Sequence, residues 1–169
     1  MPQFHDAETW QTRLAALPLT SYGAGETVFT EGTRTGQLLI LKSGVVTIVK
    51  GGTEIATVAE PGVIFGEMSA LLDQPHTADV RTVEASEFHV ADAAALLSED
   101  PVALLYVATV LARRLDYTNQ ALLELKSQLQ AGESPGLIDQ TIDRIEGLLS
   151  AIGAGYIRAG AGLAMFPPS

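Results

Sequence analysis

Between residues 20 and 90, short runs of β-branched and aliphatic residues alternate with turn signals. The runs TVFT, LLILK, VVTIVK and TEIATV are separated by EGTRTG, SG, GG and AEPG. Two-residue breaks at Ser43-Gly44 and Gly51-Gly52 are typical of tight hairpins, because glycine readily adopts the positive φ that these turns need. Regular strands with such turns predict a β-barrel or jelly roll.

Residues 78–90 alternate well enough to add two more strands to this barrel. Successive side chains of a strand point to opposite faces. We therefore expect an inward-facing set in this segment: Val80, Val83, Phe88 and Val90.

Helical patterns flank the predicted strands. Residues 6–17 have apolar positions at helical spacing and stop before Pro18. After residue 90, the segment ADAAALLSEDP predicts one short helix. A long helix follows from Pro101, a residue favoured at the first helical position, and covers about 102–129. The predicted fold is thus mainly β, with flanking helices.

The second half of the long helix carries an apolar stripe at alternating spacings of three and four residues, which is the pattern of a coiled coil. Its members are Leu111, Leu115, Thr118, Leu122, Leu125 and Leu129. The helix could instead lie on its own barrel, as its apolar first half suggests. The single stripe and polar flanks of the second half favour self-association, so we expect a homodimer through these residues.

The C-terminal part of the chain forms a separate predicted unit. The segment AGESPG at 131–136 breaks the long helix and acts as a hinge, and residues 137–152 repeat an amphipathic helical pattern. A Gly/Ala-rich apolar tail follows. We divide the chain into 1–130, the barrel with its long helix, and 131–169, a unit expected to contact a protein partner.

Charge and composition exclude several classes of function. The 169 residues include 20 acidic and 10 basic side chains, giving a formal net charge of −10, which disfavours binding to a polyanion. The residues printed after Gln130 are too few and too acidic for a winged helix-turn-helix, so we expect no DNA binding. No cysteine is present, and no apolar run reaches the length of a membrane span. Without a secretion signal, a cytoplasmic location is expected.

The order of these motifs resembles the cyclic nucleotide-binding domain family, which includes catabolite-activator-type regulators, cyclic-nucleotide-gated channels and kinase regulatory subunits. The likeness covers about residues 10–127. It rests on YGAGETVFTEG, LLILKSGVVTIV, PGVIFGEMSALL, TADVRT and LARRLDYTNQ, in that order. The resemblance implies a sensory barrel that binds cAMP or cGMP.

The resemblance also implies a ligand site in the loop after FGE. In the family, backbone N–H groups and one arginine of this loop hold the cyclic phosphate, and the glutamate binds the ribose 2′-hydroxyl. Gly66 would let the backbone approach a ligand closely, and Glu67 would accept from the hydroxyl. The candidate ligand-binding residues are Phe65, Gly66, Glu67, Met68, Ser69, His76, Thr77 and Ala78.

Position 76 departs from the family pattern, because His76 stands where the family carries the phosphate-binding arginine. An ordinary histidine has a pKa of roughly 6.5, so near neutral pH only a minority is charged. Losing a charge-assisted pair costs about 1.5–3 kcal/mol, or roughly ten- to a hundredfold in affinity. A bound phosphate would raise the pKa of this histidine and recover part of the loss, and His76→Arg would tighten binding.

Two neighbouring positions leave alternatives open. Thr77 lies where some family members carry a hydroxyl that favours guanine, but it is equally an ordinary strand threonine. Arg81 shares a strand face with Thr77, and could reach the pocket or lie on the surface. His5 falls in the N-terminal segment, and His89 is expected to face solvent.

No catalytic triad, phosphate-binding P-loop or metal-ligand spacing is present, so we expect neither an enzyme nor a metal site. The predicted function is a sensory module that binds a cyclic nucleotide, uses no other cofactor, and relays binding through the long helix to a partner. The alternative is a degenerate module that binds no nucleotide and acts in protein assembly. The substitution at position 76 supports this alternative.

Overall fold

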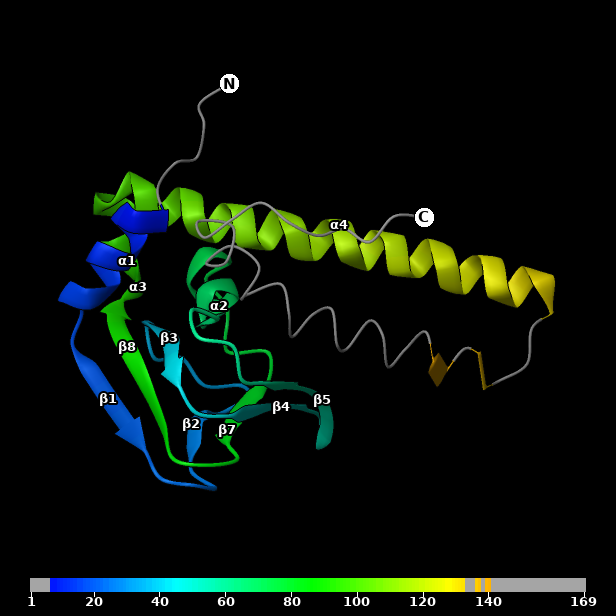
Figure 1. The fold of residues 1–169 in the computed structure, drawn as a ribbon, viewed down its shortest axis with the longest axis horizontal. Coiled ribbons are helices and arrows are strands. Elements are labelled where there is room, and N and C mark those ends of the chain that lie inside the picture. The colour runs from blue at the N-terminus through cyan, green and yellow to red at the C-terminus, as the bar shows by residue number, and fades with distance from the viewer. Residues whose placement is uncertain (1–6, 133–135, 138, 141–169) are drawn as a thin grey trace.

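Two four-stranded antiparallel sheets form the body of the molecule, and a long helix crosses one end of it (Figure 1). The computed structural model describes residues 7–132, 136–137 and 139–140. One sheet has the strand order β1-β8-β3-β6 and the other β2-β7-β4-β5. The fold therefore confirms the predicted β-barrel followed by a long helix.

The strands are short, as the turn signals predict. They are β1 (Leu19–Tyr22), β2 (Thr27–Phe29), β3 (Gln37–Ser43), β4 (Val46–Lys50), β5 (Thr53–Val58), β6 (Ile64–Phe65), β7 (Asp79–Thr82) and β8 (Ser86–Asp92). The helices are α1 (Ala7–Ala16), α2 (Glu67–Leu71), α3 (Ala93–Glu99) and α4 (Pro101–Ala131). Strands β1 and β6 were not predicted individually.

Strand β3 explains the uninterrupted apolar run LLILK, because both of its faces are buried. Leu38 and Ile40 pack against the flanking helices, in a cluster that contains Trp10 and Tyr106. Leu39 and Leu41 point the other way, into the core between the two sheets. A strand covered on both faces has no polar side, so its sequence does not alternate.

Helix α4 begins at a well-defined cap beside the barrel. The Asp100 carboxylate accepts hydrogen bonds from the backbone N–H groups of Val102 and Ala103, at 3.0 and 3.2 Å, and Pro101 occupies the first turn. The same carboxylate is ion-paired with Arg13 of α1. Asp100 thus connects the start of α4 to α1.

The turn at Ser43-Gly44 is not a hairpin, contrary to the sequence prediction. Strands β3 and β4 belong to different sheets, so the chain crosses between layers at this point. A Cβ on Gly44 would lie 2.2–2.6 Å from Ser86, so glycine is needed for the close approach to β8. The Gly51-Gly52 prediction is confirmed, because β4 and β5 pair through this turn with both glycines at positive φ.

Two predictions about side-chain direction were wrong. Val83 is 55% exposed, because β7 ends at Thr82 and the period-2 pattern does not continue into the next strand. His89 is half-buried rather than facing solvent, because it is paired with Ile40 and so lies on the face of the sheet that the flanking helices cover. The other three predicted inward residues, Val80, Phe88 and Val90, lie in or against the core between the sheets.

Among the residues that the structure describes, no single helix is both long and apolar enough to cross a membrane. Helices α3 and α4 reach the required length and composition only as a pair, and their axes are bent by 105° at the break. Apart from residues 137, 139 and 140, the predicted amphipathic helix at 137–152 lies outside the described residues, as do the apolar tail and His5.

Candidate functional site

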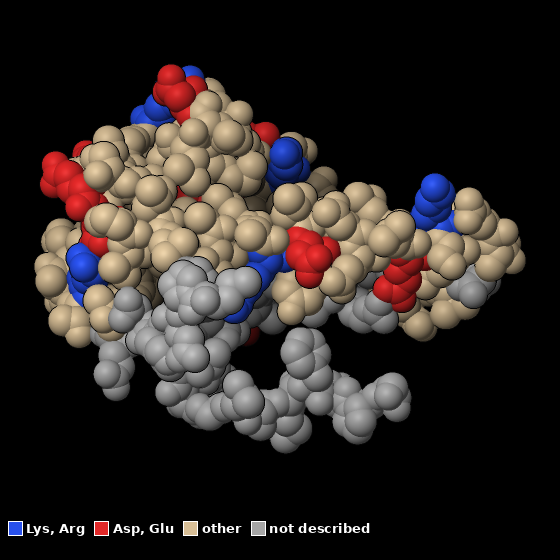
Figure 2. All heavy atoms as spheres, turned by 90° about the horizontal axis from the view of Figure 1, so that it is seen from above, with Lys and Arg blue, Asp and Glu red and all other residues tan. Residues whose placement is uncertain are grey.

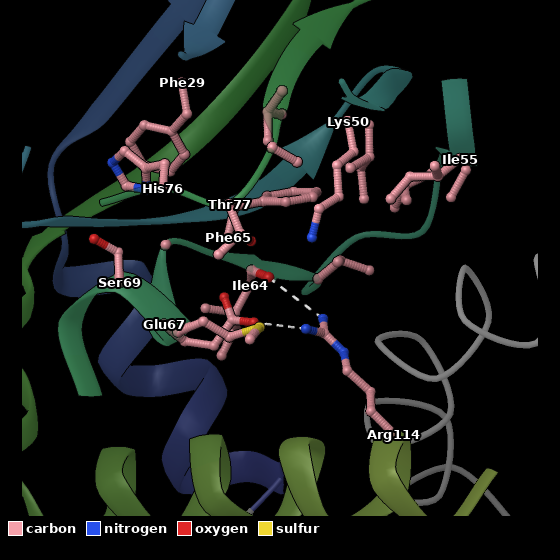
Figure 3. Close-up of a pocket in the computed structure, with 18 residues that line it drawn as sticks. Phe29, Lys50, Ile55, Ile64, Phe65, Glu67, Ser69, His76, Thr77 and Arg114 are labelled. Carbon is pink, nitrogen blue, oxygen red and sulfur yellow. Dashed lines mark hydrogen bonds and ion pairs between the residues drawn. The ribbon is translucent and has the colours of Figure 1, made fainter. Parts of the chain in front are cut away.

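A cavity of about 310 Å³ opens between the β2-β7-β4-β5 sheet, the segment around α2 and helix α4 (Figure 3). All eight candidate ligand-binding residues line it: Phe65, Gly66, Glu67, Met68, Ser69, His76, Thr77 and Ala78. The structure therefore brings together two stretches, 65–69 and 76–78, that the sequence placed in one loop. The remaining lining is mainly apolar and comes from β2, β4, β5, β6, β7, α4 and Val63.

Gly66 has a structural reason to be glycine that the sequence did not reveal. Its φ is +92°, and a Cβ at this position would lie 2.5 Å from the carbonyl oxygen of Gln37 and 3.2 Å from the ring of Phe29. The close approach is thus to the neighbouring strand and ring. Gly66 also starts α2, which has five residues and therefore only a weak helix dipole.

The loop after α2 is held against the turn that follows β2. The backbone N–H of His76 donates to the carbonyl of Thr33 at 2.8 Å, and His76 in turn accepts from the N–H of Gly32 at 2.9 Å. The hydroxyl of Ser69 donates to the carbonyl of Gln74 at 2.5 Å. These bonds shape the cavity wall without any ligand.

His76 is packed inside the cavity wall. Its side chain is only 6% exposed, its ring stacks on Phe29 with centroids 4.1 Å apart, and its Nε2 lies 2.9 Å from Thr35 Oγ1. Burial lowers the pKa of His76 below its ordinary value. The imidazole is therefore neutral at pH 7, and a hydroxyl already occupies one of its two nitrogens.

Glu67 and Arg114 form an ion pair that joins the cavity to α4. Arg114 Nη1 donates to Glu67 Oε1 at 2.6 Å, and its Nη2 lies 3.4 Å from the carbonyl oxygen of Ile64. The Glu67 side chain is 6% exposed and that of Arg114 is 23% exposed. A buried carboxylate needs such a partner, because an unpaired charge away from water is costly. The predicted hydroxyl acceptor is thus occupied by an arginine from the long helix.

Two basic residues of the site were missed by sequence reasoning. Arg114 lies in the motif LARRLDYTNQ, but nothing local shows that it reaches a glutamate 47 positions away. Lys50 lines the cavity from the end of β4, and Figure 3 shows its amine directed into the space. Its signal was the alternation of β4, which places Val46, Ile48 and Lys50 on one face.

The open alternative for Arg81 is decided by its contacts. Arg81 is ion-paired with Asp79 at 2.6 Å and does not line the cavity, so it is a surface arginine. Thr77 does line the cavity and is half-buried. Within the described part of the chain, no group of three or more potential metal ligands is present.

The predicted coiled-coil stripe is largely exposed on the second half of α4. Leu115, Leu122 and Leu129 are 62%, 59% and 64% exposed, and Thr118 is exposed as well. Leu111 instead packs partly against the helix-side core, which is the cluster of Trp10 and Tyr106 between the sheet and the flanking helices. Leu125 is half-buried. Figure 2 shows this half of the helix projecting from the body with few charged side chains.

Comparison with models of protein families gives one match, which covers the barrel. The family model of the cyclic nucleotide-binding domain matches residues 19–99. Residues 19–99 belong to the cyclic nucleotide-binding domain family. This match spans β1 to α3 and includes the whole loop from Phe65 to Ala78. Comparison with curated protein sequences gives no match.

Solved structures show the same fold around this cyclic nucleotide-binding domain. The catabolite activator protein of Thermus thermophilus is 26% identical, with a TM-score of 0.59, and the match covers 86% of this chain and 84% of that one. The cAMP-bound PfPKA-R (141–441) is 22% identical, with a TM-score of 0.50, and the match covers 72% of this chain. This chain spans only 39% of the length of that protein.

A third similar structure is the regulatory subunit of a cAMP-independent protein kinase A from Trypanosoma brucei. It is 22% identical, with a TM-score of 0.54, and the match covers 65% of this chain and 40% of that one. The fold is therefore shared by proteins described as cAMP-bound and as cAMP-independent. The likeness to the two kinase proteins extends to the fold alone.

Proposed function

We propose that the cavity binds a cyclic nucleotide and that α4 senses its occupancy. The observation that carries this proposal is the cavity itself, which joins the loop from Phe65 to Ala78 with a charged residue from α4. Its volume of about 310 Å³ lies at the lower end of the range for small-molecule sites. A mainly apolar lining with a few polar groups is also typical of such sites.

The polar groups of the cavity divide into two sets that suit the two ends of a nucleotide. Glu67 and Arg114 offer a carboxylate acceptor and a guanidinium donor next to each other, which suits a ribose hydroxyl. Ser69, His76 and Thr77 form another part of the wall. With His76 neutral, this part binds a phosphate through hydrogen bonds rather than through a charge on the imidazole.

The ion pair between Glu67 and Arg114 supplies the route to α4. A ligand hydroxyl that hydrogen-bonds to Glu67 competes with Arg114 for the same carboxylate, so the occupied and empty states differ in how α4 is held. In this proposal the exposed stripe of α4 joins two copies of the chain, and the domain acts by regulating a partner rather than by catalysis. Most of the segment of the predicted relay, 137–169, lies outside the described residues.

Isothermal titration calorimetry of the full chain with cAMP and cGMP at pH 6 and pH 8 tests the binding proposal. We expect saturable binding of at least one nucleotide. Because burial lowers the pKa of His76, we expect an affinity that changes little between the two pH values. Absence of binding up to millimolar nucleotide at both pH values would exclude this function.

The second candidate is a scaffold that binds no nucleotide. It is favoured by His76, because this ring is stacked on Phe29 and hydrogen-bonded to Thr35. The imidazole therefore does not offer a phosphate the paired hydrogen bonds that an arginine would offer. A likeness of fold to a cAMP-independent kinase regulatory subunit is compatible with it. A null titration combined with an intact dimer would support the scaffold.

A further inference from the structure

The cavity contains three basic side chains, and they differ in whether an acidic partner neutralises them. Arg114 is paired with Glu67 at 2.6 Å. His76 is buried and neutral, and its Nε2 is bonded to Thr35. Among the residues that the structure describes, Lys50 has no ion-pair partner at its amine. Lys50 and Arg114 each carry one positive charge, and Glu67 carries one negative charge. Since Glu67 and Arg114 neutralise each other, the uncompensated positive charge of the cavity belongs to Lys50.

Lys50 is the last residue of β4, and its exposed side chain lines the cavity on the same strand face as two apolar residues. On β4, Val46 lies in the core between the sheets and Ile48 packs against it, and Lys50 continues the same face at the mouth of the cavity. On the paired strand, Ile55 is the extra residue where the register shifts, and it lines the cavity beside Lys50. An ammonium at an inward-facing position is expected where it meets an anion or water.

The turn that carries Lys50 is anchored to the rest of the barrel. The backbone N–H of Gly51 donates to the Glu31 carboxylate at 2.9 Å, and the N–H of Glu31 donates to Asp79 Oδ1 at 2.6 Å. These bonds connect the end of β4 to the start of β7, which borders the loop from His76 to Ala78. The base of the Lys50 side chain is therefore held in place relative to the cavity wall.

We propose that Lys50 supplies the positive charge for the anionic group of the ligand, in place of the arginine that His76 replaces. This inference rests on the proposed function and names the group that makes an anionic nucleotide acceptable in the cavity. A single fixed charge matches the single negative charge of a phosphodiester. The cation thus comes from β4 rather than from the loop where the sequence places it.

The test is calorimetry with cAMP and cGMP at pH 6 and pH 8 on the full-length wild type, Lys50→Gln, Lys50→Arg and Lys126→Gln. Lys126 is exposed on α4 and does not line the cavity, so its variant makes the same change in net charge elsewhere. Removing a charge-assisted contact is expected to weaken binding by roughly tenfold or more. We expect this loss for Lys50→Gln, retained binding for Lys50→Arg, and a change below about twofold for Lys126→Gln.

The outcomes separate this inference from the proposed function. Wild-type binding that is unchanged in Lys50→Gln would overturn the role of Lys50 and leave nucleotide binding intact. The titratable groups that line the cavity are Lys50, Glu67, His76 and Arg114. If the wild-type affinity falls from pH 6 to pH 8, and His76→Gln abolishes this pH dependence, the positive charge belongs to His76 and the role of Lys50 is overturned. No binding by the wild type would overturn both proposals. Matched melting temperatures of the variants show that they are folded.

Discussion

At the scale of single residues, the neutral imidazole of His76 links the cavity to the stability of the fold. Burial lowers the pKa of His76, and burial is also the main cause that lowers the pKa of His89. In the unfolded chain each of these histidines titrates near its ordinary value of about 6.5. Below that pH the unfolded state therefore binds more protons than the folded state, and acid favours unfolding.

We predict that the melting temperature of the wild type falls as the pH is lowered from 7 to 5.5. His76→Gln retains a polar group near Thr35 but cannot titrate, so its melting temperature should fall less over the same range. Each fully uncompensated proton changes the free energy of unfolding by about 1.4 kcal/mol per pH unit. Thermal unfolding followed by circular dichroism measures both curves. Parallel curves for the two proteins would contradict a depressed pKa at His76.

At the scale of elements, the two halves of α4 differ in what covers them. Its first half is part of the helix-side core, where Ala103, Tyr106, Val107 and Val110 are buried. Its second half leaves leucines of the predicted stripe exposed at seven-residue spacing, at Leu115, Leu122 and Leu129. Burying each leucine against a second copy would stabilise a dimer by about 1.5–3 kcal/mol. With these two different halves, one helix would be able to belong both to the domain and to a dimer.

We predict that Leu122→Glu converts a dimer into a monomer, because it places a charge in the middle of the stripe. Leu123→Glu is the matched control, since Leu123 is 69% exposed and adjacent in sequence but lies off the stripe. Sedimentation equilibrium measures both masses. A monomeric wild type, or equal dimerisation by both variants, would show that the stripe is not the dimer interface.

At the scale of the whole molecule, the ion pair between Glu67 and Arg114 connects the ligand cavity to α4. The two residues are 47 positions apart, and the pair holds the segment that starts α2 against the long helix (Figure 3). A ligand in the cavity changes how α4 is held only if it binds with different affinity when Glu67 and Arg114 are paired and when they are apart.

We predict that cAMP changes amide hydrogen exchange in the second half of α4 in the wild type, and that Arg114→Met removes this change. The measurement is made at nucleotide concentrations that saturate each protein, because Arg114→Met removes a cavity-lining group and so changes the affinity. Arg113→Met is the control, since Arg113 is exposed on the same helix and does not line the cavity. An unchanged exchange response in Arg114→Met would contradict a relay through this ion pair.

The sequence by itself was sufficient to predict the barrel, the long helix and the loop that lines the cavity. These features depend on local chemistry: glycines with positive φ at the turn between β4 and β5, a proline at the start of α4, and an apolar run in β3. Such signals are contained within a few neighbouring residues. The eight candidate ligand-binding residues were named from the resemblance to the cyclic nucleotide-binding family, and they share one cavity wall because they lie close together in the chain.

Only the tertiary structure decided which groups face the cavity and in what charge state. The burial of His76 depends on Phe29 and Thr35, the partner of Glu67 comes from α4, and Lys50 enters from the end of β4. The crossing at Gly44 between the two sheets likewise depends on contact with β8. Each of these features joins residues that are distant in the chain. Pattern and spacing describe neighbours in sequence, whereas packing and pKa depend on neighbours in space.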